Sequence, residues 1–236
     1  MSVDEMRRTN RAQKRYYELA DGGTPSAANG VVTNLYRSFR NRALRSLPID
    51  QYVAREKALH KAWIGDPAGM RVLDMGCGSG NPLSLWLARR AHDYTAIDLS
   101  ETQLKPLRAR LPQRPRVRAI AGDFLDTDFG PAGFDLIYAR SIFHHFRHFD
   151  DFLRCLKAQM NPGGIVITHD PLQTWLPARS LRALYRPFQT DRDWEYPFTR
   201  ASLTTIGRHF DIMAVQGVMR SSKWAMLAGL ALPSLG

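Results

Sequence analysis

The chain has 236 residues, of which 44% are hydrophobic and 23% charged, so it has the composition of a globular domain with additions and not that of a disordered or fibrous protein. The formal net charge of +11 favours anionic partners or surfaces, although the clustered basic residues are equally compatible with solvated helix faces. Two cysteines make no disulfide framework, and the sequence shows neither a signal-peptide layout nor an apolar run of about 18 residues, so we expect a cytoplasmic protein.

Helical spacing of apolar residues marks the first quarter of the chain. The residues that recur at this spacing are Leu35, Phe39, Ala43, Tyr52, Leu59 and Trp63. The stretch Asp21-Gly22-Gly23-Thr24-Pro25-Ser26 interrupts the pattern and is typical of a loop. We therefore expect residues 1–64 to form an N-terminal helical extension or cap, followed by one larger domain over 65–236.

Short apolar runs alternate with helical segments from about residue 70 onward, which is typical of a parallel sheet covered by helices. The expected strands are 71–74, 94–98, 116–121, 134–138 and 165–168. Two further apolar stretches, 210–218 and 223–232, are joined by a connector too short for a crossover helix, so they predict an antiparallel hairpin at the sheet edge. The expected fold is α/β, with a seven-stranded, mostly parallel sheet and helices on both faces.

Several helix boundaries in this domain can be predicted. Asn81 is placed to cap a helix whose first residue is Pro82, and Ser100 begins a capping-box pattern. Pro106 predicts a kink or a shortened helix, and Asp150 is the expected cap of a helix running to about residue 160.

Three closely spaced glycines follow the first expected strand. Glycine lets the backbone adopt positive φ and approach a ligand closely. The third glycine of Gly76-Cys77-Gly78-Ser79-Gly80 comes one residue too early for a dinucleotide fingerprint, and Asn81-Pro82 supplies no phosphate-loop lysine. Asp74 would repel a pyrophosphate and suit a cation, which favours a sulfonium-bearing amino-acid cofactor over a dinucleotide.

Five segments in order make this chain resemble the class I S-adenosylmethionine-dependent methyltransferases over about residues 65–236. They are Asp74-Met75-Gly76-Cys77-Gly78-Ser79-Gly80, Asp98, Gly122-Asp123-Phe124, Phe134-Asp135-Leu136-Ile137 and the turn Asn161-Pro162-Gly163-Gly164. The resemblance implies a Rossmann-like fold and S-adenosyl-L-methionine as the cofactor.

The resemblance also assigns roles to residues at the strand ends. It implies that Asp74 and the backbone of the glycine loop hold the methionine portion, that Asp98 accepts from the ribose hydroxyls and that Asp123 accepts from the adenine amine. The full predicted cofactor set is Asp74, Gly76, Cys77, Gly78, Asn81, Asp98, Leu99, Asp123, Phe124 and Arg140. Two alternatives stay open: the carboxylates at 98 and 123 could cap the following helices, and Phe124 could be a core residue.

Two adjacent histidines, His144 and His145, follow the fourth expected strand, near the expected position of the methyl group. Histidine titrates near neutral pH and is therefore a candidate general base for an oxygen or nitrogen acceptor. Helix capping or packing is the alternative role for both. His148 adds a third histidine, but without a flanking acid or cysteine the pattern predicts no metal site.

The stretch over about 170–202 is an insertion rich in aromatic and charged residues, and loops on a fixed scaffold often set specificity. As a lid, it would bring side chains over the pocket, while Tyr16 and Tyr17 of the N-terminal extension could close the site from another direction. The predicted substrate residues are Tyr17, Tyr185, Arg186, Trp194 and Tyr196. The alternative is a surface loop whose aromatic residues fill a satellite core.

The leading hypothesis is therefore methyl transfer from S-adenosylmethionine to an oxygen or nitrogen of a small molecule, such as a biosynthetic intermediate. Three alternatives are a membrane-surface enzyme acting on a lipid or quinone, an RNA methyltransferase and a non-catalytic cofactor-binding subunit. Nucleic-acid methylation is disfavoured because Tyr138-Ala139-Arg140-Ser141 stands where base-amino methyltransferases place Asn/Asp-Pro-Pro-Tyr/Phe. The sequence leaves the acceptor and the oligomeric state open.

Overall fold

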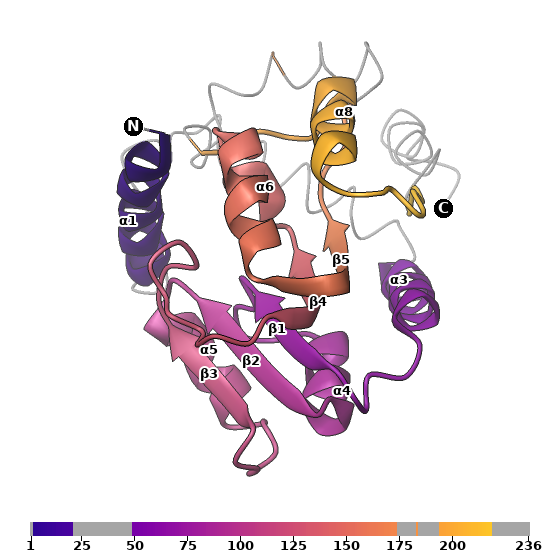
Figure 1. Cartoon of the computed structure of the whole chain (residues 1–236). Coiled ribbons are helices and arrows are strands. Elements are labelled where there is room, and N and C mark those ends of the chain that lie inside the picture. The colour runs from indigo at the N-terminus through magenta and orange to yellow at the C-terminus, as the bar shows by residue number, and fades with distance from the viewer. Residues whose placement is uncertain (1, 21–48, 174–182, 184–193, 219–236) are drawn as a thin grey trace, which may run out of the picture.

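A parallel sheet of five strands forms the centre of the described structure (Figure 1). The structure is a computed structural model that describes residues 2–20, 49–173, 183 and 194–218. The strands are β1 (Arg71–Met75), β2 (Asp93–Asp98), β3 (Val117–Ala121), β4 (Phe134–Arg140) and β5 (Met160–His169). Their order is β3-β2-β1-β4-β5, and every neighbouring pair is parallel. The chain therefore changes direction across the sheet between β1 and β4, which is where ligands bind in open α/β sheets.

Helices cover both faces of this sheet (Figure 1). They are α1 (Ser2–Ala20), α3 (Ile49–Ile64), α4 (Pro82–Arg90), α5 (Glu101–Arg108), α6 (Phe149–Ala158) and α8 (Arg200–His209), with a 3-10 turn η1 (Phe143–His145). Helices α3, α4 and α5 pack on one face, and α6 and α8 pack together on the other. Helix α1 contacts both α5 and α6, so it lies across one end of the two layers.

The two faces of the sheet carry separate apolar clusters, because side chains alternate along each strand. On the α3–α5 side, Tyr94 and Leu136 are completely buried. On the α6–α8 side, Leu73 and Ile137 pack with a group of phenylalanines that includes Phe152, whose ring is 3.8 Å from that of Phe146. Burial on both faces explains why the strand sequences read as nearly continuous apolar runs.

The positions of the first four strands are confirmed to within two residues. β5 begins earlier than predicted, because the expected turn at 161–164 lies inside the strand, next to a register shift opposite Phe134 and Leu136. Asp150 does not cap α6: it lies in the first turn, and His148 occupies the cap position without a side-chain hydrogen bond. The other helix starts agree with the prediction, since Asn81 and Ser100 accept hydrogen bonds from backbone N–H groups of α4 and α5.

The predicted C-terminal hairpin is not confirmed. α8 ends at His209, and residues 211–217 contain no strand, so the first half of that prediction is wrong. The second half, at 223–232, lies outside the described residues. Within the described part of the chain, the sheet has five strands.

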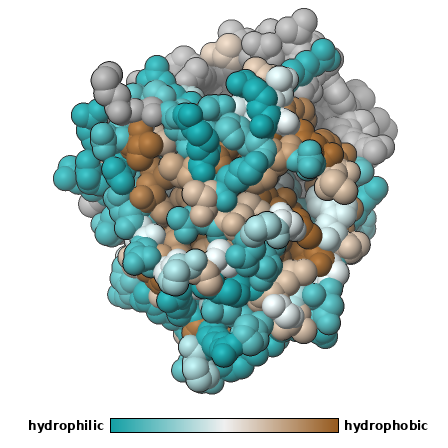
Figure 2. All heavy atoms as spheres, viewed as in Figure 1, coloured by the Kyte–Doolittle hydropathy of each residue, from teal (hydrophilic) through white to brown (hydrophobic). Residues whose placement is uncertain are grey.

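The outer face that shows α1, α6 and α8 is mainly hydrophilic, with apolar groups visible between the helices (Figure 2). This distribution is ordinary for amphipathic helices packed on a sheet. Among the described residues, no helix is both long and apolar enough to span a bilayer.

Candidate functional site

The glycine loop turns the chain sharply at the carboxyl end of β1. Gly76, Gly78 and Gly80 all have positive φ, between 50° and 76°. The N–H of Gly76 donates to the carbonyl of Ile97 at 2.8 Å, which ties the loop to the end of β2. A Cβ at Gly76 would lie 2.0 Å from Cδ1 of Ile142, so a larger residue would have to displace that side chain. The glycines therefore serve both the turn and the close approach of neighbouring segments.

Asp98, the last residue of β2, binds the glycine loop. One carboxylate oxygen accepts from the N–H of Gly78 at 2.8 Å, and the other accepts from the N–H of Ser100 at 2.9 Å. Burial raises the pKa of this carboxyl, against the effect of the two backbone donors. A carboxylate has about four lone-pair positions, so each oxygen keeps one for a further donor such as a ribose hydroxyl.

Asp74, the fourth residue of β1, is only 1% exposed. Its Oδ2 accepts a hydrogen bond from the hydroxyl of Tyr94 at 2.7 Å. Burial raises the pKa of Asp74 to about 6, although hydrogen bonds from Ser84 and Tyr94 oppose the shift. The carboxyl is therefore almost completely buried, and burial disfavours its ionised form.

This raised pKa predicts that ionisation of Asp74 destabilises the fold. The folded state retains a proton that the unfolded state releases, so the free energy of unfolding should fall as the pH rises from 3.8 to about 6. The full difference corresponds to about 3 kcal/mol. Asp74→Asn removes this titration, so urea unfolding should show the variant gaining stability relative to the wild type across that pH window. A difference between the two proteins that does not change with pH would contradict the prediction.

Asp123, which follows β3, is bound by the N-terminal helix. The side-chain amide of Asn10 on α1 lies 2.9 and 3.0 Å from the two carboxylate oxygens, and the N–H of Leu125 donates to Oδ1 at 2.9 Å. Burial raises the pKa of the Asp123 carboxyl, while the Leu125 and Asn10 donors lower it. An amide donor thus holds the position that the resemblance assigns to an adenine amine.

Asn10 and Gln13 were missed by the sequence reasoning. Both are buried, at 5% and 3% exposed, although they belong to a highly polar helix. The side-chain nitrogen of Gln13 makes no hydrogen bond with any described residue. Met6, Asn10, Gln13 and Tyr17 are spaced so that all four lie on one face of the helix. This spacing could have identified Asn10 and Gln13 as residues that face the domain.

Ion pairs hold α1 against the domain at its N-terminal end. The carboxylate of Glu5 lies 2.7 Å from Nε2 of His148, and Nε of Arg7 lies 2.6 Å from Asp126. The contact with His148 lowers the pKa of Glu5. These exposed pairs contribute little individually, but together with buried Met6 they fix where α1 lies.

His144, one of the two predicted bases, is paired with a buried carboxylate. Its Nδ1 is 2.5 Å from Oδ1 of Asp170, whose side chain is 0% exposed, and its backbone N–H donates to the same oxygen. Thr168 donates to the other oxygen of Asp170. A carboxylate that accepts from Nδ1 leaves Nε2 as the basic nitrogen of a neutral imidazole.

His145 packs against His144, with the ring centroids 4.3 Å apart. Its Nδ1 lies 3.0 Å from the carbonyl oxygen of Trp194, and the N–H of Tyr196 donates to the carbonyl of His144 at 2.7 Å. The ring of Tyr16 lies 5.3 Å from that of Trp194. The end of the predicted lid and the N-terminal helix therefore meet beside the histidine pair.

The remaining predicted residues fall into three groups. Phe124 is a core residue, since its ring packs on Phe129 and Phe152. Three others were predicted to bind the cofactor. Cys77 is a free thiol whose pKa is raised by burial, and Leu99 directly follows β2. The guanidinium of Arg140 forms an ion pair with Glu56 at 2.8 Å. The predicted substrate residues Tyr185 and Arg186 lie outside the described residues, whereas Tyr17 lies on α1 next to Tyr16.

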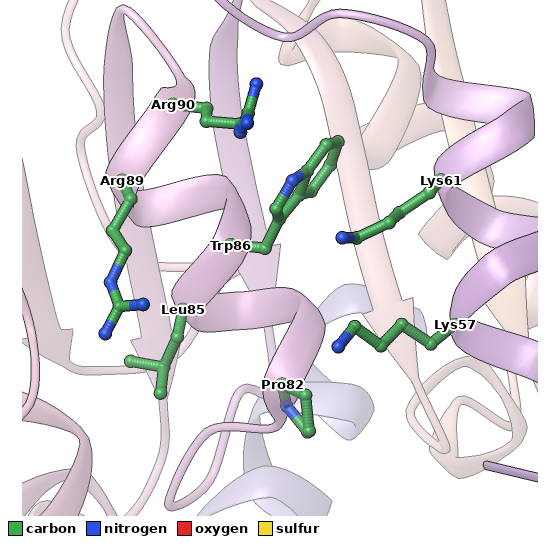
Figure 3. Close-up of a pocket in the computed structure, with 7 residues that line it drawn as sticks. All are labelled: Lys57, Lys61, Pro82, Leu85, Trp86, Arg89 and Arg90. Carbon is green, nitrogen blue, oxygen red and sulfur yellow. The ribbon is translucent and has the colours of Figure 1, made fainter. Parts of the chain in front are cut away.

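A basic groove of about 450 Å³ lies on the surface between α3 and α4 (Figure 3). Its lining consists of Lys57, Lys61, Pro82, Leu85, Trp86, Arg89 and Arg90. The Lys61 ammonium lies 4.7 Å from the Trp86 ring centroid, a cation–π contact across the groove. None of the predicted cofactor residues lines this groove, so it is distinct from the strand-end site.

The sheet order and the glycine loop at its switch point define the class of protein: a doubly wound α/β protein, a class in which ligands generally bind at the carboxyl ends of the strands. Residues 36–221 match the methyltransferase domain family, which is more than half of the chain. The chain belongs to this family, which confirms the sequence-based expectation of a methyltransferase.

Individual relatives are more distant. A trans-aconitate 2-methyltransferase from Acidovorax ebreus (strain TPSY) is 28% identical over 190 residues, covering 76% of this chain and 66% of the relative, so the match spans just under two thirds of that protein. Magnesium protoporphyrin IX methyltransferase from Synechocystis PCC 6803, solved with bound S-adenosylhomocysteine, has a TM-score of 0.52 at 17% identity, covering 76% of this chain and 87% of that one. The [4+2]-cyclase SpnF has a TM-score of 0.56 at 21% identity, covering 77% and 68%. The structural matches establish the fold.

Proposed function

We propose that this protein transfers a methyl group from S-adenosyl-L-methionine to an oxygen or nitrogen of a small molecule. One observation carries the proposal: Asp98 ends β2 and Asp123 follows the adjacent β3, beside a glycine loop with positive φ, in a chain of the methyltransferase domain family. The spacing suits a nucleoside, because one carboxylate can accept from the ribose and the next from the adenine amine. Fold alone would not support this conclusion, since a [4+2]-cyclase shares it.

His144 is the proposed general base. Asp170 orients its ring and stabilises the imidazolium that forms when Nε2 takes a proton from the acceptor. Methyl transfer also requires alignment of the acceptor with the sulfonium and exclusion of water. Helix α1 and the segment around Trp194 meet beside this histidine, so we assign exclusion of water to them.

The proposed acceptor is a small molecule held by Tyr17, Trp194 and Tyr196. The relatives named above are described as acting on trans-aconitate and on magnesium protoporphyrin IX, both of which carry carboxylates. A net charge of +11 would attract such anionic acceptors. We also propose that residues 1–64 act as a cap on the domain over 65–236, because α1 already covers Asp123.

Binding of S-adenosylhomocysteine, measured by calorimetry and by thermal unfolding, tests the proposal. At 100 times its dissociation constant, one bound equivalent should add about 2.7 kcal/mol to the free energy of unfolding. Adenosine should bind more weakly, because it lacks the amino-acid portion. If neither method detects S-adenosylhomocysteine at millimolar concentration, the proposed function is wrong.

Asn10→Ala is expected to tighten binding of S-adenosylhomocysteine about tenfold. The amide of Asn10 contacts both oxygens of Asp123, so it competes with the adenine amine for this carboxylate. Loss of a hydrogen bond to a charged group at this site would release about 1.5 kcal/mol to binding, which corresponds to about tenfold. Calorimetry on this variant and on Arg11→Ala, an exposed change on the same helix, measures the effect. Weaker binding by the Asn10 variant would mean that Asn10 contacts the cofactor instead.

A further inference from the structure

Three side chains with metal-binding atoms converge between α3 and the carboxyl end of β5. They are Glu56, His60 and His169, and one nitrogen or oxygen atom from each lies within 4.8 Å of the other two. Glu56 and His60 are one helical turn apart on α3, so they share a face of that helix. Helix α3 lies beside the sheet in Figure 1, and His169 is the last residue of β5. We propose that Glu56, His60 and His169 form a binding site for a divalent transition metal ion of the zinc type.

The burial of Glu56 and His60 is the first support. Glu56 and His60 are 6% and 3% exposed, whereas acidic and basic side chains are rarely buried without a specific partner. The ring centroid of His60 lies 5.7 Å from that of Tyr138 and 5.8 Å from that of Trp63. Packing against these two rings fixes the orientation of the imidazole. The site is therefore preorganised and shielded, unlike an exposed cluster of carboxylates.

The second support is a buried imidazole nitrogen that lacks a hydrogen bond. Nδ1 of His60 is buried and has no hydrogen-bond partner among the described residues. Nδ1 of His169 faces Glu56, 2.8 Å from its Oε1. Buried polar atoms without partners are rare in folded proteins, and a bound ion is one of the species that can satisfy them. A metal ion held by this cluster would give the His60 ring such a partner.

Arg140 provides the charge that the metal would replace. Its Nε and Nη2 lie 2.8 and 3.3 Å from the two oxygens of Glu56. The Arg140 side chain is 41% exposed, while that of Glu56 is 8% exposed, so the guanidinium can move into solvent and the carboxylate stays. Removing Arg140 should therefore strengthen metal binding, which is the opposite of the effect expected from a residue that supports the site.

The donor set selects the kind of metal. Two imidazoles and one carboxylate form the set that zinc uses when it keeps a fourth position for water or another ligand. Tetrahedral coordination at 2.0–2.2 Å requires ligand atoms about 3.4 Å apart, which small side-chain movements can reach from the observed spacing. Calcium and magnesium prefer all-oxygen sites and are not expected to bind.

The test is a titration of the metal-free full-length protein with Zn²⁺ and with Co²⁺. We expect one equivalent of Zn²⁺ by calorimetry, and Co²⁺ absorption of the kind given by tetrahedral sites. His60→Ala should weaken Zn²⁺ binding by about 100-fold or more, comparable to or above the largest losses seen when supporting residues of metal sites are changed. His92→Ala, at an exposed histidine away from the cluster, is the matched control and should leave binding unchanged.

Two further variants guard against misfolding and against adventitious binding. Glu56→Gln keeps the shape of the side chain and should also lose most Zn²⁺ affinity, whereas Arg140→Gln should bind Zn²⁺ more tightly than the wild type. Circular dichroism establishes that each variant is folded. The proposal is overturned if the wild type binds no equivalent below millimolar Zn²⁺, or if His60→Ala and Glu56→Gln, both folded, bind as the wild type does. The inference does not depend on the methyltransferase proposal, since metal binding is read without the cofactor.

Discussion

Replacing His144 by glutamine is expected to lower the turnover number by about 10²- to 10⁴-fold, the usual contribution of a general base. Glutamine keeps a hydrogen-bonding group near Asp170 but cannot take a proton. Because His144 is assigned to proton removal and not to cofactor recognition, the affinity for S-adenosylhomocysteine should stay within about twofold of the wild type. The measurement is steady-state turnover with an acceptor found by screening, together with calorimetry of cofactor binding.

His145→Gln is the matched control for this prediction, because it changes the neighbouring ring in the same way. It should reduce turnover much less than His144→Gln does. Asp170→Asn should lower turnover as well, since it removes the group that orients Nδ1 of His144. If His144→Gln retains full turnover, His144 is a packing residue.

Asp98→Ala is expected to weaken binding of S-adenosylhomocysteine by about 100-fold. Each hydrogen bond to a charged group contributes about 1.5–3 kcal/mol, and the ribose offers two hydroxyl donors. Two bonds at the lower limit of this range give a loss of about 3 kcal/mol, which corresponds to roughly 100-fold in the dissociation constant. Calorimetry measures the effect directly.

The Asp98 variant also loses the acceptors for the N–H groups of Gly78 and Ser100, so part of the effect could come from the glycine loop. Asp98→Asn separates the two contributions, because its amide oxygen still accepts one backbone hydrogen bond while the charge is gone. Asp211→Ala removes an exposed carboxylate and should change nothing. Unchanged affinity in both Asp98 variants would refute the assignment of this residue to the ribose.

The sheet was largely predictable because its strands are buried on both faces and therefore stand out as short apolar runs. The start of β5 could not be predicted, because residues 161–164 have the sequence of a turn. In the structure Met160 already pairs with Phe134, and a register shift between Phe134 and Leu136 accommodates the residues that have no partner on β4. The start of α6 illustrates a second limit to prediction from sequence. Asp150 has the chemistry of a helix cap, yet it pairs with His209 at 2.9 Å, a contact set by the packing of α8. Local propensity cannot show such long-range partners.

The candidate site also contains residues that could be predicted from the sequence and residues that could not. The strand-end carboxylates Asp98 and Asp123 could be read from the pattern, because parallel strands end at one edge of a sheet. The approach of Asn10 to Asp123 joins positions 113 residues apart, and no periodicity in the sequence reports it. Glu56 and His60 stand one helical turn apart in the sequence, but the sequence analysis did not single them out, and His169 completes the cluster only in the fold.

A crystal structure of the full chain with S-adenosylhomocysteine tests the central claim most directly. The account predicts that the ribose hydroxyls contact the carboxylate of Asp98, that the adenine amine contacts Asp123, and that Asn10 has moved away from both of its oxygens. The sulfur should face His144. A structure in which the ligand binds elsewhere, for example in the basic groove between α3 and α4, would contradict the proposed site and the function built on it.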